Sequence, residues 1–450
     1  MSAANTIDMT HGPIMGKMMK FALPLIAGGV LQQSFNAVDV AVVGHYSTAQ
    51  ALGAVGGNTM VISILINLFL GVSMGVNVVL ANYIGRRDES GIGRSISTAA
   101  ALALVSGIIL MVAGVCFARP ILEAMGSPED VIELATLYLE IFFLGMPFMM
   151  IYNFGAAIMR SRGDTRRPFC ILVVSGVVNT LLNLLLVIEF DMSVAGVAIA
   201  TVVANAVNAA LMVRLLRREP EPYRLHLRHM RFHKTELRKI LNIGIPAGLQ
   251  GMVFSFANIF IQTAVNGYGS GAVAGAAVAV NYEFYCYFII SAFAQAAVAF
   301  TGQNYGAGLF KRCQRIFIIS MVLSVISSGV CNVLIATCSD TFAGIFSKDA
   351  NVLSYAAVRL EYVLMFQWVA CSYEIAGAVL RGLGYSMTPT VITLAGTCVL
   401  RLVWVYAVNP VFNSFDVLMT VYPLSWVLTG AVMVGAYVII TRRIRRKVTA

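Results

Sequence analysis

The chain has 450 residues, of which 59% are hydrophobic and only 12% charged, and its formal net charge is +10. A soluble domain carries about 25% charged residues, and a soluble chain of this size cannot hide so much apolar surface from water. The composition therefore excludes a large soluble catalytic domain and predicts an all-α integral membrane protein.

Apolar runs bounded by charged or turn residues predict twelve transmembrane helices, since one span needs about 20 residues. In the first half of the chain they cover residues 18–44, 55–83, 95–117, 131–154, 168–188 and 194–216. In the second half they cover residues 240–266, 275–302, 316–338, 352–380, 389–408 and 417–441.

The basic residues collect on one side of these spans. With twelve spans, 27 of the 31 Lys and Arg residues fall in the alternate loops and the termini that share that side. Lys and Arg accumulate in cytoplasmic loops, so both termini and the loop 217–239 are expected in the cytoplasm. The positive charge is thus a topology signal, and nucleic-acid binding is not expected.

The chain also repeats itself at an offset of 220–222 residues. Pro24 matches Pro246, and AAIMRSRGDTRRP at 156–168 matches GAVLRGLGYSMTP at 377–389. Each repeat holds six spans, and an even number makes the two repeats run the same way through the membrane. We therefore expect two six-helix lobes, residues 1–216 and 240–450, joined by a basic cytoplasmic loop at 217–239. Such paired lobes are typical of secondary transporters.

Four stretches of the chain are distinctive, namely NAVDVAVVGHYSTAQALGAVG at 36–56, GQNYGAG at 302–308, MRSRGDTRRP at 159–168 and LRGLGYSMTP at 380–389. Together they resemble the multidrug and toxic compound extrusion (MATE) family, in its bacterial type with an aspartate in the N-terminal lobe. The resemblance runs in order through essentially the whole chain. It implies a monomeric twelve-helix exporter of the cell (inner) membrane that expels organic compounds in exchange for protons or sodium. Such a protein is not an enzyme and needs no cofactor or metal; no Walker-type GxxxxGK[ST] sequence occurs in the chain.

Polar side chains inside the spans are candidates for the coupling ion, because ionisable residues in lipid are costly and usually functional. Asp39 and Asn183 each lie ~8 Å from the outer ends of their spans, and Thr201 ~10 Å from the outer end of its span. Asn179 is one turn deeper than Asn183 on the same helix face. These oxygens could hold sodium or form a protonatable network; helix packing by hydrogen bonds is the plain alternative.

The resemblance sharpens this hypothesis. Many bacterial and archaeal members carry an aspartate, an Asn and an Asp four residues apart, and a threonine at these places, and Asp39, Asn179 and Thr201 match them. Asn183 departs from the pattern, since the family usually has aspartate there. One carboxylate cycling one proton is therefore favoured over tight sodium coordination.

The substrate cavity is predicted around Glu283, whose neighbours Tyr282 and Tyr285 could bind a lipophilic cation by charge and cation–π contact. The alternative is an aromatic belt at the outer membrane surface. Gln32, Asn205 and Asn208 are further cavity candidates.

Three other charged residues are predicted to form a buried charge network, because Arg401 lies between Glu361 and Glu374 in depth. A proton relay or a substrate anchor is the alternative role for this set. Arg359 is expected to reach the outer surface with its head group. Pro24 removes a backbone hydrogen bond near the inner end of the first span, so it is a hinge candidate.

Two functions remain open. The first is a cation-coupled exporter of drug-like small molecules, chiefly cationic amphiphiles. The second is a flippase of lipid-linked oligosaccharides or lipids on a related fold. A flippase of that kind needs basic residues in its cavity for a pyrophosphate, and only Arg359 and Arg401 lie within the spans away from their cytoplasmic ends.

Overall fold

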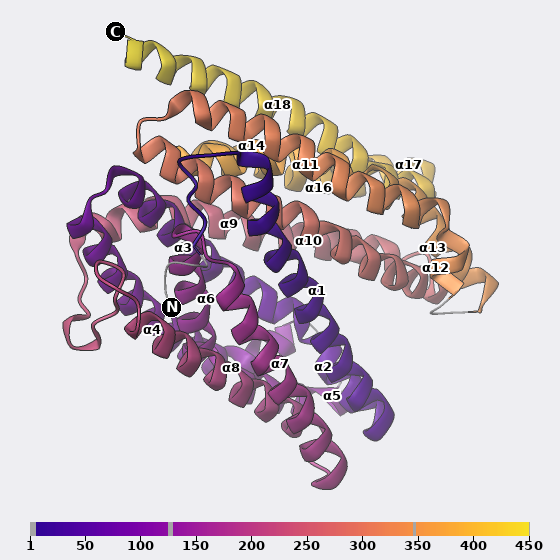
Figure 1. The fold of residues 1–450 in the computed structure, drawn as a ribbon. Coiled ribbons are helices and arrows are strands. Elements are labelled where there is room, and N and C mark those ends of the chain that lie inside the picture. The colour runs from indigo at the N-terminus through magenta and orange to yellow at the C-terminus, as the bar shows by residue number, and fades with distance from the viewer. Residues whose placement is uncertain (1–5, 125–128, 345–347, 450) are drawn as a thin grey trace. The chain divides into compact units, whose positions relative to one another are not determined.

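The structure is a computed structural model that describes residues 6–124, 129–344 and 348–449, and these residues form helices and no strands (Figure 1). Eleven helices among them are long and apolar enough to cross a membrane. The remaining predicted span, residues 131–154, is formed by two helices, Val131–Leu144 and Met146–Ser161, which are bent by 48° at the break between them. Pro147 stands at the start of the second helix, where its missing N–H interrupts the backbone ladder. Twelve spans are therefore confirmed.

The contacts divide the chain into two units. The first comprises Met1–Asp8 and Ala27–Gly248, and the second comprises Met9–Ile26 and Leu249–Ala450. The boundaries differ from the expected lobes, because the start of the first span belongs to the second unit and the start of the seventh span to the first. Two of the three changes of unit fall inside a helix, two residues after Pro24 and two residues after Pro246, and the third lies between Asp8 and Met9, before α1.

The first unit is a bundle of neighbouring helices in which α4 packs on α5 and α6, and α8 packs on α6 and α7 (Figure 1). Its elements are most of α1 (Ile14–Tyr46), α2 (Ala49–Gly57), α3 (Thr59–Arg86), α4 (Glu89–Ala124), α5 (Glu129–Leu144), α6 (Met146–Ser161), α7 (Arg166–Leu184), the π-helix Leu185–Glu189, α8 (Ser193–Arg217), the 3-10 turn Leu227–His229 and the start of α9 (Lys234–Asn266).

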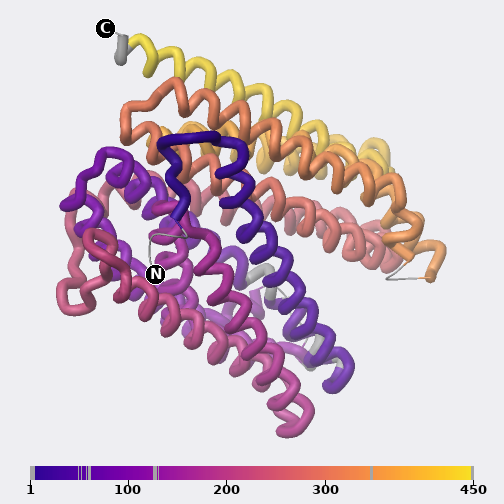
Figure 2. The backbone as a smooth tube through the Cα atoms, viewed as in Figure 1, coloured from indigo at the N-terminus to yellow at the C-terminus, as the bar shows by residue number. Residues whose placement is uncertain are grey.

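In the second unit, α10 is the central helix and packs on α11, α13 and α14, while the C-terminal helix α18 runs along α14 (Figure 2). Its elements are the rest of α1 and α9, α10 (Ser270–Gly306), α11 (Phe310–Thr337), α12 (Ser339–Gly344), α13 (Ala350–Tyr362), the 3-10 helix Leu364–Ala370, α14 (Cys371–Gly382), α15 (Met387–Thr393), the π-helix Leu394–Val399, α16 (Leu400–Val403), the π-helix Trp404–Val408, α17 (Asn409–Phe412) and α18 (Phe415–Thr449).

The best-matching repeat segments fold into the same helix end. Gly163 after α6 and Gly384 after α14 both have a positive φ, 96° and 92°. At each end the next residue donates its N–H back to the helix, Asp164 to the Met159 carbonyl at 3.0 Å and Tyr385 to the Leu380 carbonyl at 2.8 Å. This is the Schellman closure, which requires a left-handed residue and so selects glycine.

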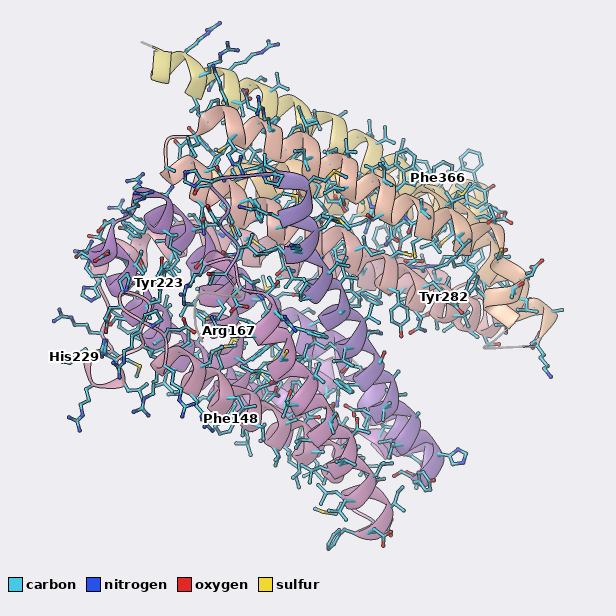
Figure 3. All side chains as sticks on the ribbon, in the orientation of Figure 1. Phe148, Arg167, Tyr223, His229, Tyr282 and Phe366 are labelled. Carbon is cyan, nitrogen blue, oxygen red and sulfur yellow. The ribbon has the colours of Figure 1, made fainter. Side chains whose placement is uncertain are left out.

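The basic loop 217–239 lies against the first unit (Figure 3 labels Tyr223 and His229 in it). The buried carboxylate of Glu219 pairs with Arg162 and Arg167. Further along, the Ser97 hydroxyl of α4 donates to the His229 carbonyl at 2.9 Å. These contacts hold the loop in place, so it is not a free linker.

Paired glycines bring α3 and the start of α9 into backbone contact. Gly71 and Gly75 are four residues apart on α3, as Gly244 and Gly248 are on α9. A Cβ at Gly71 would lie 2.1 Å from the Gly248 nitrogen, and one at Gly248 would lie 2.2 Å from the carbonyl oxygen of Leu68. Small residues at this spacing let membrane helices approach closely.

Gly248→Ala is therefore expected to lower the free energy of unfolding by about 1–3 kcal/mol, because the added methyl group can only displace backbone. Thermal unfolding of the detergent-purified protein measures this. The matched control is Gly435→Ala on α18, where a Cβ meets no atom within 4 Å. Equal unfolding midpoints for the two variants would show that the close crossing does not exist.

Candidate functional site

Four polar residues of the first unit come together as the sequence predicts. Asn183 on α7 donates its amide N–H to the Asp39 carboxylate of α1. The same nitrogen lies 3.5 Å from the Asn179 oxygen, and the Asn179 amide nitrogen lies 3.4 Å from the Thr201 hydroxyl oxygen of α8. We call these four residues the Asp39 cluster.

The Asp39 cluster is mostly shielded from solvent. Asn183 is fully buried and Asn179 is 6% exposed, while Asp39 and Thr201 are half-buried. The Asn183 oxygen has no hydrogen-bond partner, although it is buried. Asp39 is the one carboxylate of the cluster, so a proton or a cation can change the charge of the cluster only there.

Local packing explains how α1 reaches α7. A Cβ at Gly176 would lie 1.6 Å from the Phe35 ring, so only glycine lets the two helices meet at this level. The π-helix Leu185–Glu189 begins two residues after Asn183. π-Helical turns inside α-helices are frequent at functional sites, since they leave backbone groups less regularly bonded.

Tyr138 on α5 is a member of this neighbourhood that the sequence reasoning missed. It is 7% exposed and lies near the Asp39 carboxylate. Its position among the apolar residues of a span looks like ordinary packing in the sequence. Only the tertiary structure brings Tyr138 of α5 near Asp39 of α1.

The other predicted polar residues of the first unit make no hydrogen bond to the Asp39 cluster within the described parts of the chain. Gln32 is exposed on α1, and Asn205 is half-buried on α8. Asn208 is 5% exposed, and its side-chain oxygen has no partner. Their place in a substrate cavity stays a prediction.

Glu283 is not the free carboxylate that a cationic substrate would need. Arg359 donates to both of its oxygens, from Nε at 2.6 Å and from Nη2 at 3.0 Å. Arg359 is 4% exposed, so the expectation that its head group reaches the outer surface is wrong. The Arg359 guanidinium stays buried beside Glu283, because a bidentate ion pair offsets the cost of removing both charged groups from water.

The two tyrosines beside Glu283 point to other environments. The Tyr282 hydroxyl donates to the Phe342 carbonyl at 2.8 Å, and its ring meets the Phe342 ring edge-on (Figure 3 labels Tyr282 on α10). Tyr285 is half-buried. Their predicted part in substrate binding is not tested by these contacts.

The predicted network of Glu361, Glu374 and Arg401 is wrong. Glu361 is exposed, and Glu374 accepts a hydrogen bond from the Tyr287 hydroxyl at 3.3 Å. Arg401 has no carboxylate within ion-pair distance among the described residues. Similar depth did not produce a contact, because the helices turn these side chains in different directions.

Pro24 lies inside α1, close to the point where the contacts of that helix pass from one unit to the other. Its role as a hinge stays a prediction. Within the described ranges, no group of three or more His, Cys, Asp or Glu side chains could hold a metal ion.

Comparison with known families identifies the chain. A MatE family model matches residues 24–185 and again residues 246–407, which reproduces the internal repeat at an offset of 222, from 24 to 246. The chain belongs to the MatE family. The resemblance drawn from the sequence motifs is thereby confirmed, as is the fold of twelve spans in two parallel repeats.

Among MatE relatives, the probable multidrug resistance protein YoeA of Bacillus subtilis (strain 168) is 28% identical over 385 residues, covering 84% of this chain and 83% of that protein. A solved outward-facing multidrug resistance MATE family transporter of the MOP superfamily has a TM-score of 0.90 at 19% identity, covering 99% and 100% of the two chains. A MOP superfamily transporter from Pyrococcus furiosus, described as having a binding pocket of reverse polarity that suggests a different function, has a TM-score of 0.91 at 19% identity, covering 99% of each chain. These structural likenesses show the MatE fold.

Proposed function

We propose that this MatE-family protein is a secondary active exporter of organic amphiphilic compounds, cationic drugs among them, that is driven by proton antiport. The Asp39 cluster carries this proposal, because it places a single carboxylate among buried neutral hydrogen-bonding groups inside a membrane bundle. The relatives YoeA and MepA bear names of multidrug resistance and multidrug export proteins, which supports the cargo class.

The hydrogen-bond pattern favours a proton over sodium. Sodium would need oxygen ligands directed at it, as hard cations do. Asn183 instead turns its amide nitrogen to Asp39, and its oxygen points elsewhere. An N–H donor stabilises the ionised carboxylate. Protonation of Asp39 would remove the negative charge and so weaken the hydrogen bond from the Asn183 amide.

Coupling between proton movement and substrate transport would follow from this change in the hydrogen bond between Asn183 and Asp39. The protonated and ionised forms of Asp39 bind the Asn183 amide with different strength, so they favour different packings of α1 on α7. Only such a difference in affinity between two states can let a proton drive substrate release. Two parallel repeats offer the alternating access that a transporter needs.

The placement in the membrane is part of the same proposal. We place the chain in the cell membrane as a monomer, with both termini and the loop 217–239 in the cytoplasm, because the loops on that side hold most of the basic residues.

The proposal is tested by loading ethidium into proteoliposomes and imposing a pH gradient and a sodium gradient in separate experiments. We expect ethidium movement with the pH gradient alone and none with the sodium gradient. Movement that follows sodium instead would refute proton coupling. Absence of movement under both gradients, repeated with neutral and anionic dyes, would refute drug export and favour the flippase.

A further inference from the structure

Arg401 is a charged side chain deep inside the second unit that forms no ion pair with any described residue. It is 1% exposed and lies on α16, roughly 16 Å from the helix end at Phe412 and 21 Å from Met387 at 1.5 Å per residue. That depth is near the middle of a hydrocarbon core of about 30 Å. A charge there is costly and usually has a function.

The contacts of Arg401 leave part of its guanidinium unused. Nη1 donates to the Asn258 side-chain oxygen on α9 at 3.3 Å. The Tyr422 and Phe254 rings lie 4.5 Å and 5.2 Å from the guanidinium carbon. Nε and Nη2 are buried and have no hydrogen-bond partner. Two N–H-bearing nitrogens therefore remain available to an acceptor.

The neighbouring charges do not neutralise Arg401. Tyr422 lies between two arginines, since Arg359 also donates to its hydroxyl at 3.4 Å. The carboxylate of Glu283 already accepts hydrogen bonds from both Nε and Nη2 of Arg359. Of the two guanidinium groups beside Tyr422, Arg359 therefore has a carboxylate partner, whereas Arg401 forms no ion pair among the described residues.

The repeat gives this position a counterpart in the first unit. At the nearest repeat match, Pro168 with Pro389, the offset is 221, so Arg401 corresponds to Thr180, the residue after Asn179 of the Asp39 cluster. Asn258 on α9 corresponds to Asn36 on α1 at the offset of 222 that joins Pro24 and Pro246. The corresponding region of each repeat therefore holds polar side chains, with the carboxylate of Asp39 in the first repeat and the guanidinium of Arg401 in the second.

The backbone around Arg401 is also irregular. π-Helices at Leu394–Val399 and Trp404–Val408 flank the four residues of α16 on both sides. The first unit has its π-helix just after Asn183. Such turns mark functional sites, and they allow a helix to change its local winding.

We propose that Arg401 is the core of an anion-binding site in the second unit, which receives a carboxylate of the transported molecule or an inorganic anion such as chloride. Nε and Nη2 provide the two parallel donors that a carboxylate fits. In the present conformation Tyr422 and Phe254 cover the guanidinium, and the anion enters when one of these rings turns aside. With this site, the protein would export zwitterionic or anionic compounds in addition to cations. This statement about cargo rests on the proposed export function, whereas the binding of an anion at Arg401 does not.

Binding is tested first on the purified wild-type protein, with thermal unfolding and tryptophan fluorescence as readouts, since Trp404 is three residues from Arg401. Methanesulfonate, an anion without a carboxylate, is replaced by benzoate or chloride at constant ionic strength, and benzamide is the neutral analogue of benzoate. We expect benzoate, chloride or both to raise the unfolding midpoint and change the fluorescence with saturation, and benzamide to do neither. An equal response to benzamide, or no response to any anion, overturns the proposal.

Variants then assign the response to the residue. Arg401→Gln is expected to weaken anion binding about tenfold or more, the usual loss for a hydrogen bond to a charged group. Arg401→Lys keeps the charge and should retain part of the response. Arg443→Gln, an exposed arginine of α18, is the control and should retain all of it. An undiminished response in Arg401→Gln overturns the assignment.

Transport separates the two sources of the anion. Rhodamine B has a free carboxylate, and its ethyl ester lacks one. If the anion belongs to the cargo, Arg401→Gln raises KM for rhodamine B about tenfold and leaves KM for the ester nearly unchanged. If the anion is inorganic, chloride raises the unfolding midpoint of the wild-type protein, and Arg401→Gln changes KM for the two dyes by the same factor. If wild-type protein moves neither dye nor ethidium, the export function fails, and the benzoate and chloride titrations still decide the site.

Discussion

Asp39→Asn is expected to reduce proton-driven efflux to the background rate, a loss of at least about tenfold, because it removes the only carboxylate of the Asp39 cluster. The substitution keeps the shape of the side chain and its hydrogen-bonding capacity, so the fold should survive. Initial rates of dye movement in proteoliposomes with an imposed pH gradient measure the effect. Substrate binding, followed by dye fluorescence, should persist, since binding needs no proton transfer.

Glu361→Gln is the matched control, because Glu361 is an acid of a membrane helix that lies exposed in the second unit. Its efflux rate should stay within about twofold of the wild type. Asn183→Asp adds the aspartate that the family usually has at this position, and we expect it to create a response to sodium. Proton-driven efflux that continues in Asp39→Asn would contradict the proton site.

Breaking the pair of Glu283 and Arg359 should have the largest effect on stability. Each single change, Glu283→Gln or Arg359→Gln, leaves one charge buried without a partner, and such changes cost about 3–5 kcal/mol. The double variant removes both charges and should recover much of that loss. Thermal unfolding of the four proteins completes a double-mutant cycle and yields the coupling energy.

The comparison pair is Arg119 and Glu123, which lie one turn apart with 54% and 55% of their side chains exposed, against 5% and 13% for Arg359 and Glu283. Arg119→Gln should cost less than about 1 kcal/mol, as exposed pairs do. If Arg359→Gln is no more destabilising than Arg119→Gln, the buried pair does not exist in solution.

The sequence alone predicts the features that depend on local pattern. Twelve apolar runs give twelve spans because lipid demands about 20 apolar residues for each. The repeat and the family follow from motifs whose order along the chain is preserved. Asn179 and Asn183 could be placed on one face because a helix brings residues four apart together, and Asp39 could be matched to them in depth.

Contacts between distant helices required the tertiary structure. Glu283 and Arg359 are 76 residues apart, and nothing in either local sequence pairs them. Arg401 was assigned to Glu361 or Glu374 on depth alone, and it contacts Asn258, Phe254 and Tyr422 instead. Depth follows from the position of a residue along its span, but a contact also depends on how each helix is rotated about its own axis. A helix that is apolar all round gives little sign of that rotation. For this reason the sequence determined the spans, the repeat and the depth of the polar residues, and only the packing of the helices decided that Glu283 pairs with Arg359 and that Arg401 pairs with neither Glu361 nor Glu374.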